Sequence, residues 1–337
     1  MNAASSSALV QSLFLCKEEN FTDKALEVFN FQYEHNKVYK AYCNILKTVP
    51  AAVNCLEKIP FLPIQFFKSK HIKTTEFEPV IIFESSGTTG AINSKHFVKD
   101  LSVYEESFMK CFRNFYGDEK QICIIGLLPS YLERRGSSLV YMVDDLIKKS
   151  ADKGSGFYLY DHEKLKKVLL QNERELQPTI LIGVTYALLD FAEQNKLRLK
   201  NTIIMETGGM KGRRKEMNRK EVHEILKKNL NITSIHSEYG MTELLSQAYS
   251  KGEGIFECPA WMRILIRKED DPFEISTGEK CKEMFCNGAV NIIDLANIYS
   301  CSFIATDDMG KLYKNNNFEI TGRLENSDMR GCGLMIL

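Results

Sequence analysis

A cluster of glycine and hydroxyl residues follows directly on an apolar run. Pro79–Phe83 reads as a strand, and Glu84–Gly90, with the sequence Glu-Ser-Ser-Gly-Thr-Thr-Gly, comes next. Glycine lets backbone N–H groups approach an anion closely, and the hydroxyls add further donors, so this segment has the chemistry of a phosphate-binding loop. It is not a Walker loop, because Ala91 and Ile92 follow its last glycine. A polar β-turn is the alternative, and composition alone favours it.

Three later segments carry the other groups that nucleotide chemistry requires. Ser237–Glu243 contains an aromatic ring, a hydroxyl and a carboxylate, directly after a strand-like run that ends at His236. Open α/β sheets bind their ligands at the carboxyl ends of strands, so this position suits a site. Thr306–Gly310 and Thr321–Arg323 add two aspartates and an arginine. Each segment alone is more often a turn with solvated charges.

The order of the four segments is much more specific than any one of them. Ser-Ser-Gly-Thr-Thr-Gly, Tyr-Gly-Met-Thr-Glu, Thr-Asp-Asp-Met-Gly and Gly-Arg, in this order, resemble the adenylate-forming superfamily of acyl-CoA synthetases and adenylation domains. The lead-in Ile59–Lys68 resembles that of the acyl-protein synthetase family, LuxE, and the chain stops just after the Gly-Arg segment. The resemblance spans nearly the whole chain.

The resemblance implies ATP and Mg²⁺ as cofactors. The β- and γ-phosphates of ATP would be held by Ser85, Ser86, Gly87, Thr88, Thr89 and Gly90. Lys95 would act as a counter-charge, although the Pro-Lys pair that usually follows this loop in the superfamily is absent. Gly208 and Gly209 would form a flat backbone wall between adenine and the acyl pocket. Tyr239, followed by Gly240, would pack on the adenine ring.

The resemblance also implies which residues contact the α-phosphate, the metal ion and the ribose. Thr242 would bond the α-phosphate, and Glu243 would help to hold Mg²⁺. Asp308 would accept hydrogen bonds from the ribose hydroxyls, because the superfamily's aspartate precedes a hydrophobic residue and a glycine, and Asp307 does not. Arg323 would contact ribose or phosphate. These residue types suit the reaction, since joining a carboxylate to ATP brings anions together and requires N–H donors, a cation and Mg²⁺.

A cysteine close to the C-terminus is the candidate nucleophile. By default a lone cysteine is an inert buried residue. Cys332, however, has glycine on both sides, and Arg330 could stabilise a thiolate. Acyl-protein synthetases resemble this chain in placing an acylated cysteine there. The resemblance therefore implies that Cys332 takes the acyl group and offers it to a reductase subunit or another acceptor protein.

The end of the chain departs from the superfamily pattern. Superfamily ligases usually carry a small mobile C-terminal domain after the hinge, with a lysine that assists adenylation, whereas only Leu324–Leu337 follow the Gly-Arg segment here. We expect the core without that domain. Either Lys95 or Arg323 supplies charge to a slower adenylation, or a partner subunit completes the site.

Apolar runs that alternate with amphipathic stretches indicate an α/β core with parallel strands. The predicted parts are a helical lead-in over 1–70, an α/β adenylate-forming core over 71–260, and a β-rich subdomain over 261–337 that ends in the hinge and a short tail. The predicted strands include Phe157–Tyr160 and Ile232–His236. The predicted helices include Asp23–Phe29, capped by Asp23 or Thr22, and Arg214–Lys228.

Composition excludes several classes of protein. The 44 basic and 44 acidic residues of this 337-residue chain leave no charge excess for nucleic acid or an anionic membrane. No run reaches the length of about 20 apolar residues that a membrane-spanning helix needs, and Val10–Cys16 is too short for an export signal. The ten cysteines lack zinc-ligand spacing, and we expect buried thiols in a reducing, cytoplasmic setting. The six histidines form no helical metal pair, and His236 reads as a structural residue lining a pocket.

The resulting hypothesis is an ATP-dependent ligase that converts a carboxylic acid, by family likeness a fatty acid, into acyl-AMP and then a cysteine thioester. One alternative resembles phenylacetate-CoA ligase and uses coenzyme A as the acceptor. The other is a non-catalytic scaffold that binds nucleotide or acyl groups and needs a partner for chemistry.

Overall fold

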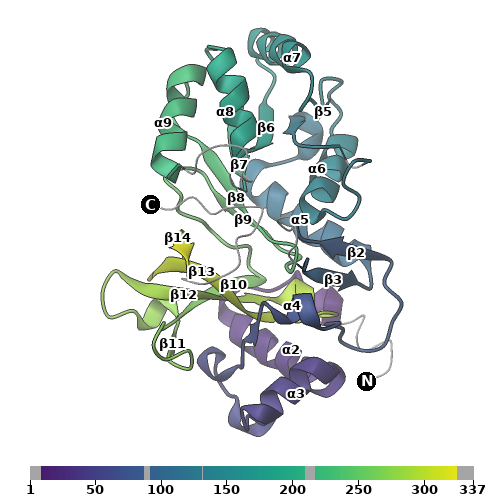
Figure 1. Cartoon of the computed structure of the whole chain (residues 1–337), viewed down its shortest axis with the longest axis vertical. Coiled ribbons are helices and arrows are strands. Elements are labelled where there is room, and N and C mark those ends of the chain that lie inside the picture. The colour runs from purple at the N-terminus through teal and green to yellow at the C-terminus, as the bar shows by residue number, and fades with distance from the viewer. Residues whose placement is uncertain (1–8, 87–91, 131, 209–216, 325–337) are drawn as a thin grey trace.

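The computed structural model describes residues 9–86, 92–130, 132–208 and 217–324, which form two sheets surrounded by helices (Figure 1). We call them the α/β sheet, in the upper half of Figure 1, and the β-rich sheet, in the lower half. A two-stranded antiparallel hairpin, β2 (Ile81–Glu84) and β3 (Lys95–Val98), lies between these halves. The predicted mixed α/β fold is confirmed.

The α/β sheet has the strand order β5-β4-β6-β7-β8-β9. Its strands are β4 (Cys123–Leu127), β5 (Gly156–Phe157), β6 (Thr179–Val184), β7 (Thr202–Thr207), β8 (His236–Tyr239) and β9 (Ala248–Ser250). Neighbours pair in parallel from β5 to β8, and β9 is antiparallel to β8. The central strands β4 and β6 are buried along their whole length, as parallel strands covered on both faces must be.

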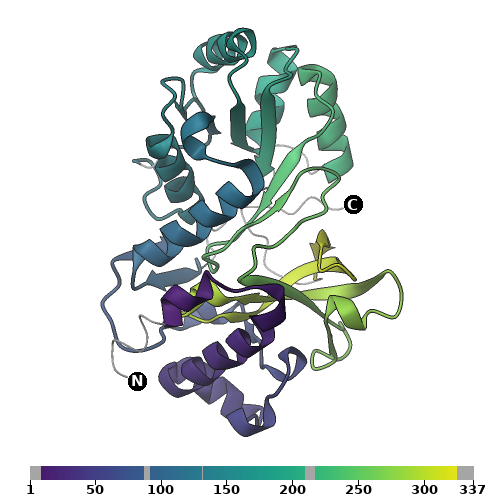
Figure 2. The ribbon, with the colours of Figure 1, turned by 180° about the vertical axis from the view of Figure 1, so that it is seen from behind.

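Helices cover both faces of this sheet (Figures 1 and 2). They are α5 (Leu101–Tyr116), α6 (Ser138–Lys149), α7 (His162–Glu175), α8 (Thr185–Gln194) and α9 (Arg219–Leu230). α5 and α6 lie on one face, and α8 and α9 pack side by side on the other. Side-chain caps begin several of them, such as Asp100 before α5, whose carboxylate accepts from the Ser102 N–H at 2.9 Å.

The β-rich sheet has the order β1-β13-β12-β10-β11, with β14 paired to β13. Its strands are β1 (Leu62–Pro63), β10 (Met262–Arg267), β11 (Ile275–Ser276), β12 (Phe285–Asp294), β13 (Phe303–Tyr313) and β14 (Phe318–Arg323). The helices α2 (Phe21–His35), α3 (Lys37–Ile45) and α4 (Phe66–Ser69) accompany this half. Aromatic contacts dock α2 and α3 on the sheet, since the rings of Phe29 and Tyr39 both contact Phe303. The three-part division of the chain stays a prediction.

Four predicted elements need correction. The strand predicted over Phe157–Tyr160 is confined to β5, and the one predicted over Ile232–His236 starts only at His236. The helix predicted over Asp23–Phe29 extends over all of α2, and Asn20 occupies its N-cap position. The helix predicted from Arg214 begins at Arg219, behind a capping box made by Asn218 and Glu221, among the described residues. In each case pairing, packing or capping sets the boundary, and apolar pattern alone does not contain that information.

The cysteines differ in part from the expectation of buried thiols. Cys281 and Cys286 form a disulfide, with Cα atoms 5.3 Å apart. The free cysteines that are fully buried are Cys16, Cys43, Cys111, Cys123 and Cys301. Among the described residues, no helix is long and apolar enough to cross a membrane.

Candidate nucleotide-binding site

The predicted phosphate loop extends from the β2–β3 hairpin. Glu84 and Lys95 face each other in the last pair of the hairpin, with their charged groups 3.6 Å apart. At the base of the loop, the Ser85 hydroxyl accepts a hydrogen bond from the Ser94 N–H at 2.9 Å, and the Ser85 N–H donates to the Ser94 carbonyl at 3.1 Å. Ser86 continues the loop, and Gly87–Gly90 lie outside the described residues. Lys95 therefore lies in the last pair of the hairpin, at the base of the loop.

His96 joins this hairpin to the Tyr-Gly-Met-Thr-Glu segment. The ring is buried, and its Nδ1 donates a hydrogen bond of 2.9 Å to the Thr242 carbonyl. Burial lowers the pKa of His96 to about 4, so the ring is neutral near pH 7 and carries its proton on Nδ1. The strand after the phosphate loop is thereby fixed to the residue that is predicted to bond the α-phosphate.

Glu243 is buried beside the same contact. The side-chain amide of Asn297 donates to the Glu243 carbonyl at 2.7 Å. The negative charge of Glu243 acts on His96, where it partly opposes the effect of burial on the pKa. Glu243 therefore lies near His96, on the strand that follows the phosphate loop, although sequence separates the two segments widely.

The position of Glu243 fits a jointly held Mg²⁺. Protein sites usually bind Mg²⁺ through one or two carboxylates together with substrate phosphates, rather than through a complete protein cage. The described residues contain no group of three or more His, Cys, Asp or Glu side chains that could hold a metal alone. The buried Glu243 carboxylate, on the segment that His96 fixes to the phosphate-loop hairpin, can supply one ligand of such a shared metal.

Tyr239 and Asp308 bring the two sheets together. The Tyr239 hydroxyl, at the end of β8, donates a hydrogen bond of 2.8 Å to Asp308 on β13. The Tyr239 ring packs against Phe256 and Phe318, at centroid distances of 5.9 and 5.5 Å. Both Tyr239 and Asp308 are buried. A hydrogen bond therefore connects the residues predicted to contact adenine and ribose.

Arg323 completes this group of side chains. It is paired across β13 and β14 with Asp308, and its guanidinium lies 3.6 Å from the Asp308 carboxylate and 3.3 Å from that of Asp307. Asp307 also accepts a hydrogen bond of 2.6 Å from the Gln65 amide. The two neighbouring aspartates share Arg323 and differ in their other partner, which is Tyr239 for Asp308 and Gln65 of the lead-in segment for Asp307.

Gly208 directly follows β7, at the same edge of the α/β sheet as Tyr239. Its φ of +70° is a backbone conformation that other residues adopt only with strain. Its carbonyl accepts a hydrogen bond from the Thr185 hydroxyl at the start of α8. Two residues earlier, the buried Glu206 carboxylate lies 3.7 Å from His223 and 4.0 Å from Arg219, both on α9. This buried group fixes the end of β7 to the helix behind it.

Glu238 lies at this edge of the sheet, and the sequence analysis assigned it no role. The Thr207 hydroxyl donates to its carboxylate at 2.5 Å, across the β7–β8 pair. A Cβ on Gly240 would come within 2.4 Å of the same carboxylate, so a larger residue there would force the Glu238 side chain to shift. Burial, and secondarily the charge of Glu206, raises the pKa of Glu238 to about 7. In the sequence, only its position directly before Tyr239 indicates that Glu238 lies near the site.

The structure therefore gathers the described members of all four segments. The predicted residues brought together are Ser85, Ser86, Lys95, Gly208, Tyr239, Gly240, Thr242, Glu243, Asp308 and Arg323. The predicted residues Gly87, Thr88, Thr89, Gly90, Gly209 and Cys332 lie outside the described residues. His96 and Asn297, which the sequence did not single out, hold the gathered segments in place.

The order of these motifs and the mixed α/β fold agree with the resemblance to the adenylate-forming superfamily that the sequence analysis drew. A family model described as "Acyl-protein synthetase, LuxE" matches residues 15–337. The chain belongs to this acyl-protein synthetase family. A search of curated proteins found no match.

Several solved structures are similar to the chain at low sequence identity. O-succinylbenzoate coenzyme A synthetase from Bacillus subtilis, solved with ATP and magnesium, shares 16% identity at a TM-score of 0.45, covering 74% of this chain and 52% of that one. The long-chain-fatty-acid-CoA ligase from Archaeoglobus fulgidus shares 14% at 0.49, covering 72% and 51%. The amide bond synthetase McbA from Marinactinospora thermotolerans shares 13% at 0.47, covering 76% and 51%. The chain spans about half the length of these proteins.

Proposed function

We propose that this protein activates a carboxylic acid with ATP and transfers the acyl group to a cysteine thiol. In the first step the acid carboxylate attacks the α-phosphorus of ATP, a C–O–P linkage forms, and pyrophosphate leaves. The convergence of the four segments carries this proposal. His96, on the strand that follows the loop, donates to Thr242 of the second segment. The Tyr239–Asp308 hydrogen bond joins the second segment to the third, and the Arg323–Asp308 pair adds the fourth.

Each group in the site has a task in this reaction. The loop Ser85–Gly90 supplies donors to the β- and γ-phosphates, and Thr242 supplies a hydroxyl to the α-phosphate. Asp308 accepts from the ribose hydroxyls, and Arg323 offsets negative charge beside it. Mg²⁺, held by Glu243 and the phosphates, would neutralise charge on the departing pyrophosphate. The fixed relative positions of these residues supply the remaining rate enhancement.

In the second step Cys332 takes the acyl group. The thiol loses its proton to solvent, the thiolate sulfur attacks the acyl carbon, and AMP leaves as the C–O bond breaks. The substrate is a fatty acid and the final acceptor is a reductase or another acyl-accepting protein, a proposal supported by membership in the acyl-protein synthetase family.

The exchange of radioactive pyrophosphate into ATP tests the first step. We expect the purified protein to catalyse this exchange only when a suitable acid is added from a panel of fatty and aromatic acids. Glu243→Gln removes a negative charge at the metal and should reduce the exchange rate by at least about 100-fold. Glu283→Gln, on an exposed residue, is the matched control.

The outcomes separate the alternatives. Exchange that requires an acid, followed by turnover that requires coenzyme A, identifies an acyl-CoA ligase in place of a protein ligase. Absence of exchange with every acid, although the protein binds ATP, indicates a scaffold and contradicts the proposed activity. An unchanged exchange rate in Glu243→Gln contradicts the role of that residue.

A further inference from the structure

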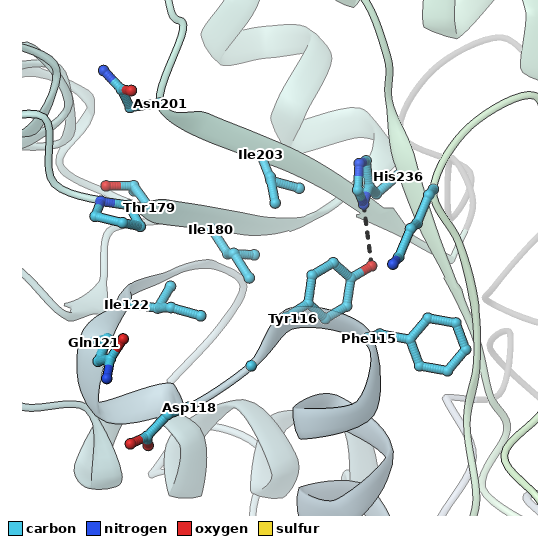
Figure 3. Close-up of a pocket in the computed structure, with 13 residues that line it drawn as sticks. Phe115, Tyr116, Asp118, Gln121, Ile122, Thr179, Ile180, Asn201, Ile203 and His236 are labelled. Atoms are coloured by element: carbon cyan, nitrogen blue, oxygen red, sulfur yellow. Dashed lines mark hydrogen bonds between the residues drawn. The ribbon is translucent and has the colours of Figure 1, made fainter.

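A cavity lies at the edge of the α/β sheet where the parallel strands begin, opposite the edge that carries Gly208 and Tyr239 (Figure 3). Its volume is about 390 Å³, within the range of small-molecule sites. The side chains of Ile180 on β6 and Ile203 on β7 form an apolar floor. Phe115 and Tyr116, at the end of α5, close the opposite side. The cavity therefore suits the apolar part of a small ligand.

One end of the cavity is polar. The His236 ring, at the start of β8, lies with its Nδ1 3.2 Å from the Tyr116 hydroxyl (Figure 3). Burial, and then the nearby charge of Lys251, lowers the pKa of His236 to about 4, so the ring is neutral near pH 7. When the Tyr116 hydroxyl donates to Nδ1, the neutral ring carries its proton on Nε2, and this N–H can donate a hydrogen bond to a ligand.

Lys251 adds a positive charge beside this histidine. It directly follows β9, whose residue Ser250 is paired with Ser237 on β8, and its ammonium lies 5.7 Å from the centre of the Phe115 ring. Within the described parts of the chain, Lys251 forms no ion pair with an acidic side chain, and it is exposed. The cavity thus offers an unneutralised cation and an N–H donor next to an apolar floor.

The acidic side chain in the cavity lining does not neutralise Lys251. Asp118 is already used locally, since its carboxylate accepts from the Lys120 N–H at 3.1 Å and caps the single turn of 3-10 helix at Glu119–Gln121. In Figure 3 Asp118 lies at the far end of the cavity from His236. A ligand at the His236 end of the cavity would therefore have to balance the positive charge of Lys251.

We propose that this cavity binds a small monocarboxylate with an apolar body, its carboxylate against Lys251 and His236 and its body over Ile180 and Ile203. The site is distinct from the nucleotide site, because His236 and Tyr239 mark opposite ends of β8, about 10 Å apart along an extended strand. It does not depend on the proposed adenylation, and its binding can be measured without ATP.

Octanoate is a suitable probe, and the imidazole resonances of His236 are a local readout. The protein has six histidines, and His236→Gln identifies the signal that belongs to this ring. We expect octanoate to shift the His236 resonance saturably at pH 7. Acetate, which lacks the apolar body, should bind at least about tenfold more weakly.

Lys251→Gln tests the cation. The side chain is exposed, so the variant should fold, and losing a charge-assisted hydrogen bond should weaken octanoate binding about tenfold. Lys228→Gln, on the exposed side of α9, is the matched control and should bind octanoate as the wild type does.

Two results would overturn the assignment. One is an unmoved His236 resonance at octanoate concentrations that shift His96, since His96 belongs to the nucleotide site and this pattern would place the acid only there. The other is equal affinity of wild type and Lys251→Gln, which would remove the cation from the site. Absence of ATP–pyrophosphate exchange would contradict the proposed function only. It would not affect the assignment of the octanoate site.

Discussion

Glu238 shows how a single side chain responds to its surroundings in this site. It lies on the face of β8 that is covered by α5. Its negative charge raises the pKa values of four neighbours: Tyr104, Cys111 and Tyr116 of that helix and Tyr249 of β9. On β7, Glu206 adds a like charge. Below pH 7 the protonated Glu238 carboxyl group repels the neighbouring Glu206 less than a carboxylate would.

Glu238→Gln should change how stability depends on pH. The folded pKa of about 7 lies above the ordinary value of 4.5, so the folded state binds a proton that the unfolded state has already lost between these values. The contribution of this group is complete below pH 4.5 and is lost as pH rises through 7. We expect the wild-type free energy of unfolding to fall by about 2 kcal/mol more than that of the variant between pH 5 and 8.

Urea unfolding of both proteins at these two pH values measures this difference. Glu283→Gln, which changes an exposed carboxylate, should follow the wild type. If Glu238→Gln also follows the wild type, the carboxyl group titrates normally in the folded protein and the expectation is wrong.

Tyr239→Phe should weaken ATP binding. The change removes the hydroxyl that donates to Asp308, so the carboxylate predicted to hold the ribose loses a fixed position. A hydrogen bond to a charged group contributes about 1.5–3 kcal/mol, and we expect the KM for ATP in pyrophosphate exchange to rise about tenfold with a smaller change in maximal rate. Tyr160→Phe, on an exposed ring, is the control. An unaltered KM in Tyr239→Phe would separate this contact from nucleotide binding.

At the scale of elements, the segment between β8 and β9 depends on anchors from the β-rich sheet. Asp294, at the end of β12, accepts hydrogen bonds from the N–H groups of Leu245 and Ser246, each at 2.9 Å. Asn297 donates to the carbonyls of Glu243 and Cys301, at 2.7 and 3.1 Å. This segment contains Thr242 and Glu243, so its position is set by residues distant in sequence.

Asn297→Ala should therefore impair adenylation from outside the site. The Glu243 carbonyl loses a buried donor, which costs about 1–3 kcal/mol of stability, and the carboxylate predicted to hold Mg²⁺ loses its alignment. We expect pyrophosphate exchange to fall about tenfold, with partial recovery at high Mg²⁺. Asn54→Ala, on an exposed amide, should change neither quantity. A stability loss with full exchange activity would limit Asn297 to a structural role.

The elements themselves were predictable where a local pattern determines them. The alternation of apolar runs and amphipathic stretches correctly predicted an α/β core. The strands expected beyond residue 261 are present as β10, β12 and β13. The boundaries of β8 were not predictable, because its pairing with Met205 and Thr207 on β7 starts at His236, whereas the apolar run before it suggested an earlier start. The pairing of β1 with β13 joins distant segments and has no local signal.

At the scale of the whole molecule, the site lies where the two sheets meet. The α/β sheet contributes Gly208 and Tyr239, the β-rich sheet contributes Asp308 and Arg323, and the hairpin between them carries the phosphate loop. Sequence order and family resemblance identified these segments, since nothing local shows that they meet. His96 could not be identified from sequence in this way, because its role depends on a contact with Thr242 that only the fold creates.

Cys332→Ser should separate the two proposed steps. Adenylation does not use the thiol, so pyrophosphate exchange should remain within about twofold of the wild type, while label from a radioactive acid should no longer become bound to the protein. Gel autoradiography before and after hydroxylamine treatment measures the thioester. Cys55→Ser, on a partly exposed free cysteine, is the control and should retain the label. Hydroxylamine-sensitive label on Cys332→Ser would place the acceptor on another residue.

The central claim is that the four segments form one nucleotide site. A crystal structure of the protein with Mg²⁺ and a non-hydrolysable ATP analogue tests this claim most directly. We expect the ribose hydroxyls at Asp308, the adenine beside Tyr239 and Gly208, and the β- and γ-phosphates in the loop Ser85–Gly90, with Mg²⁺ at Glu243. A nucleotide bound elsewhere, with the Tyr239–Asp308 contact and the loop remote from it, would contradict the claim.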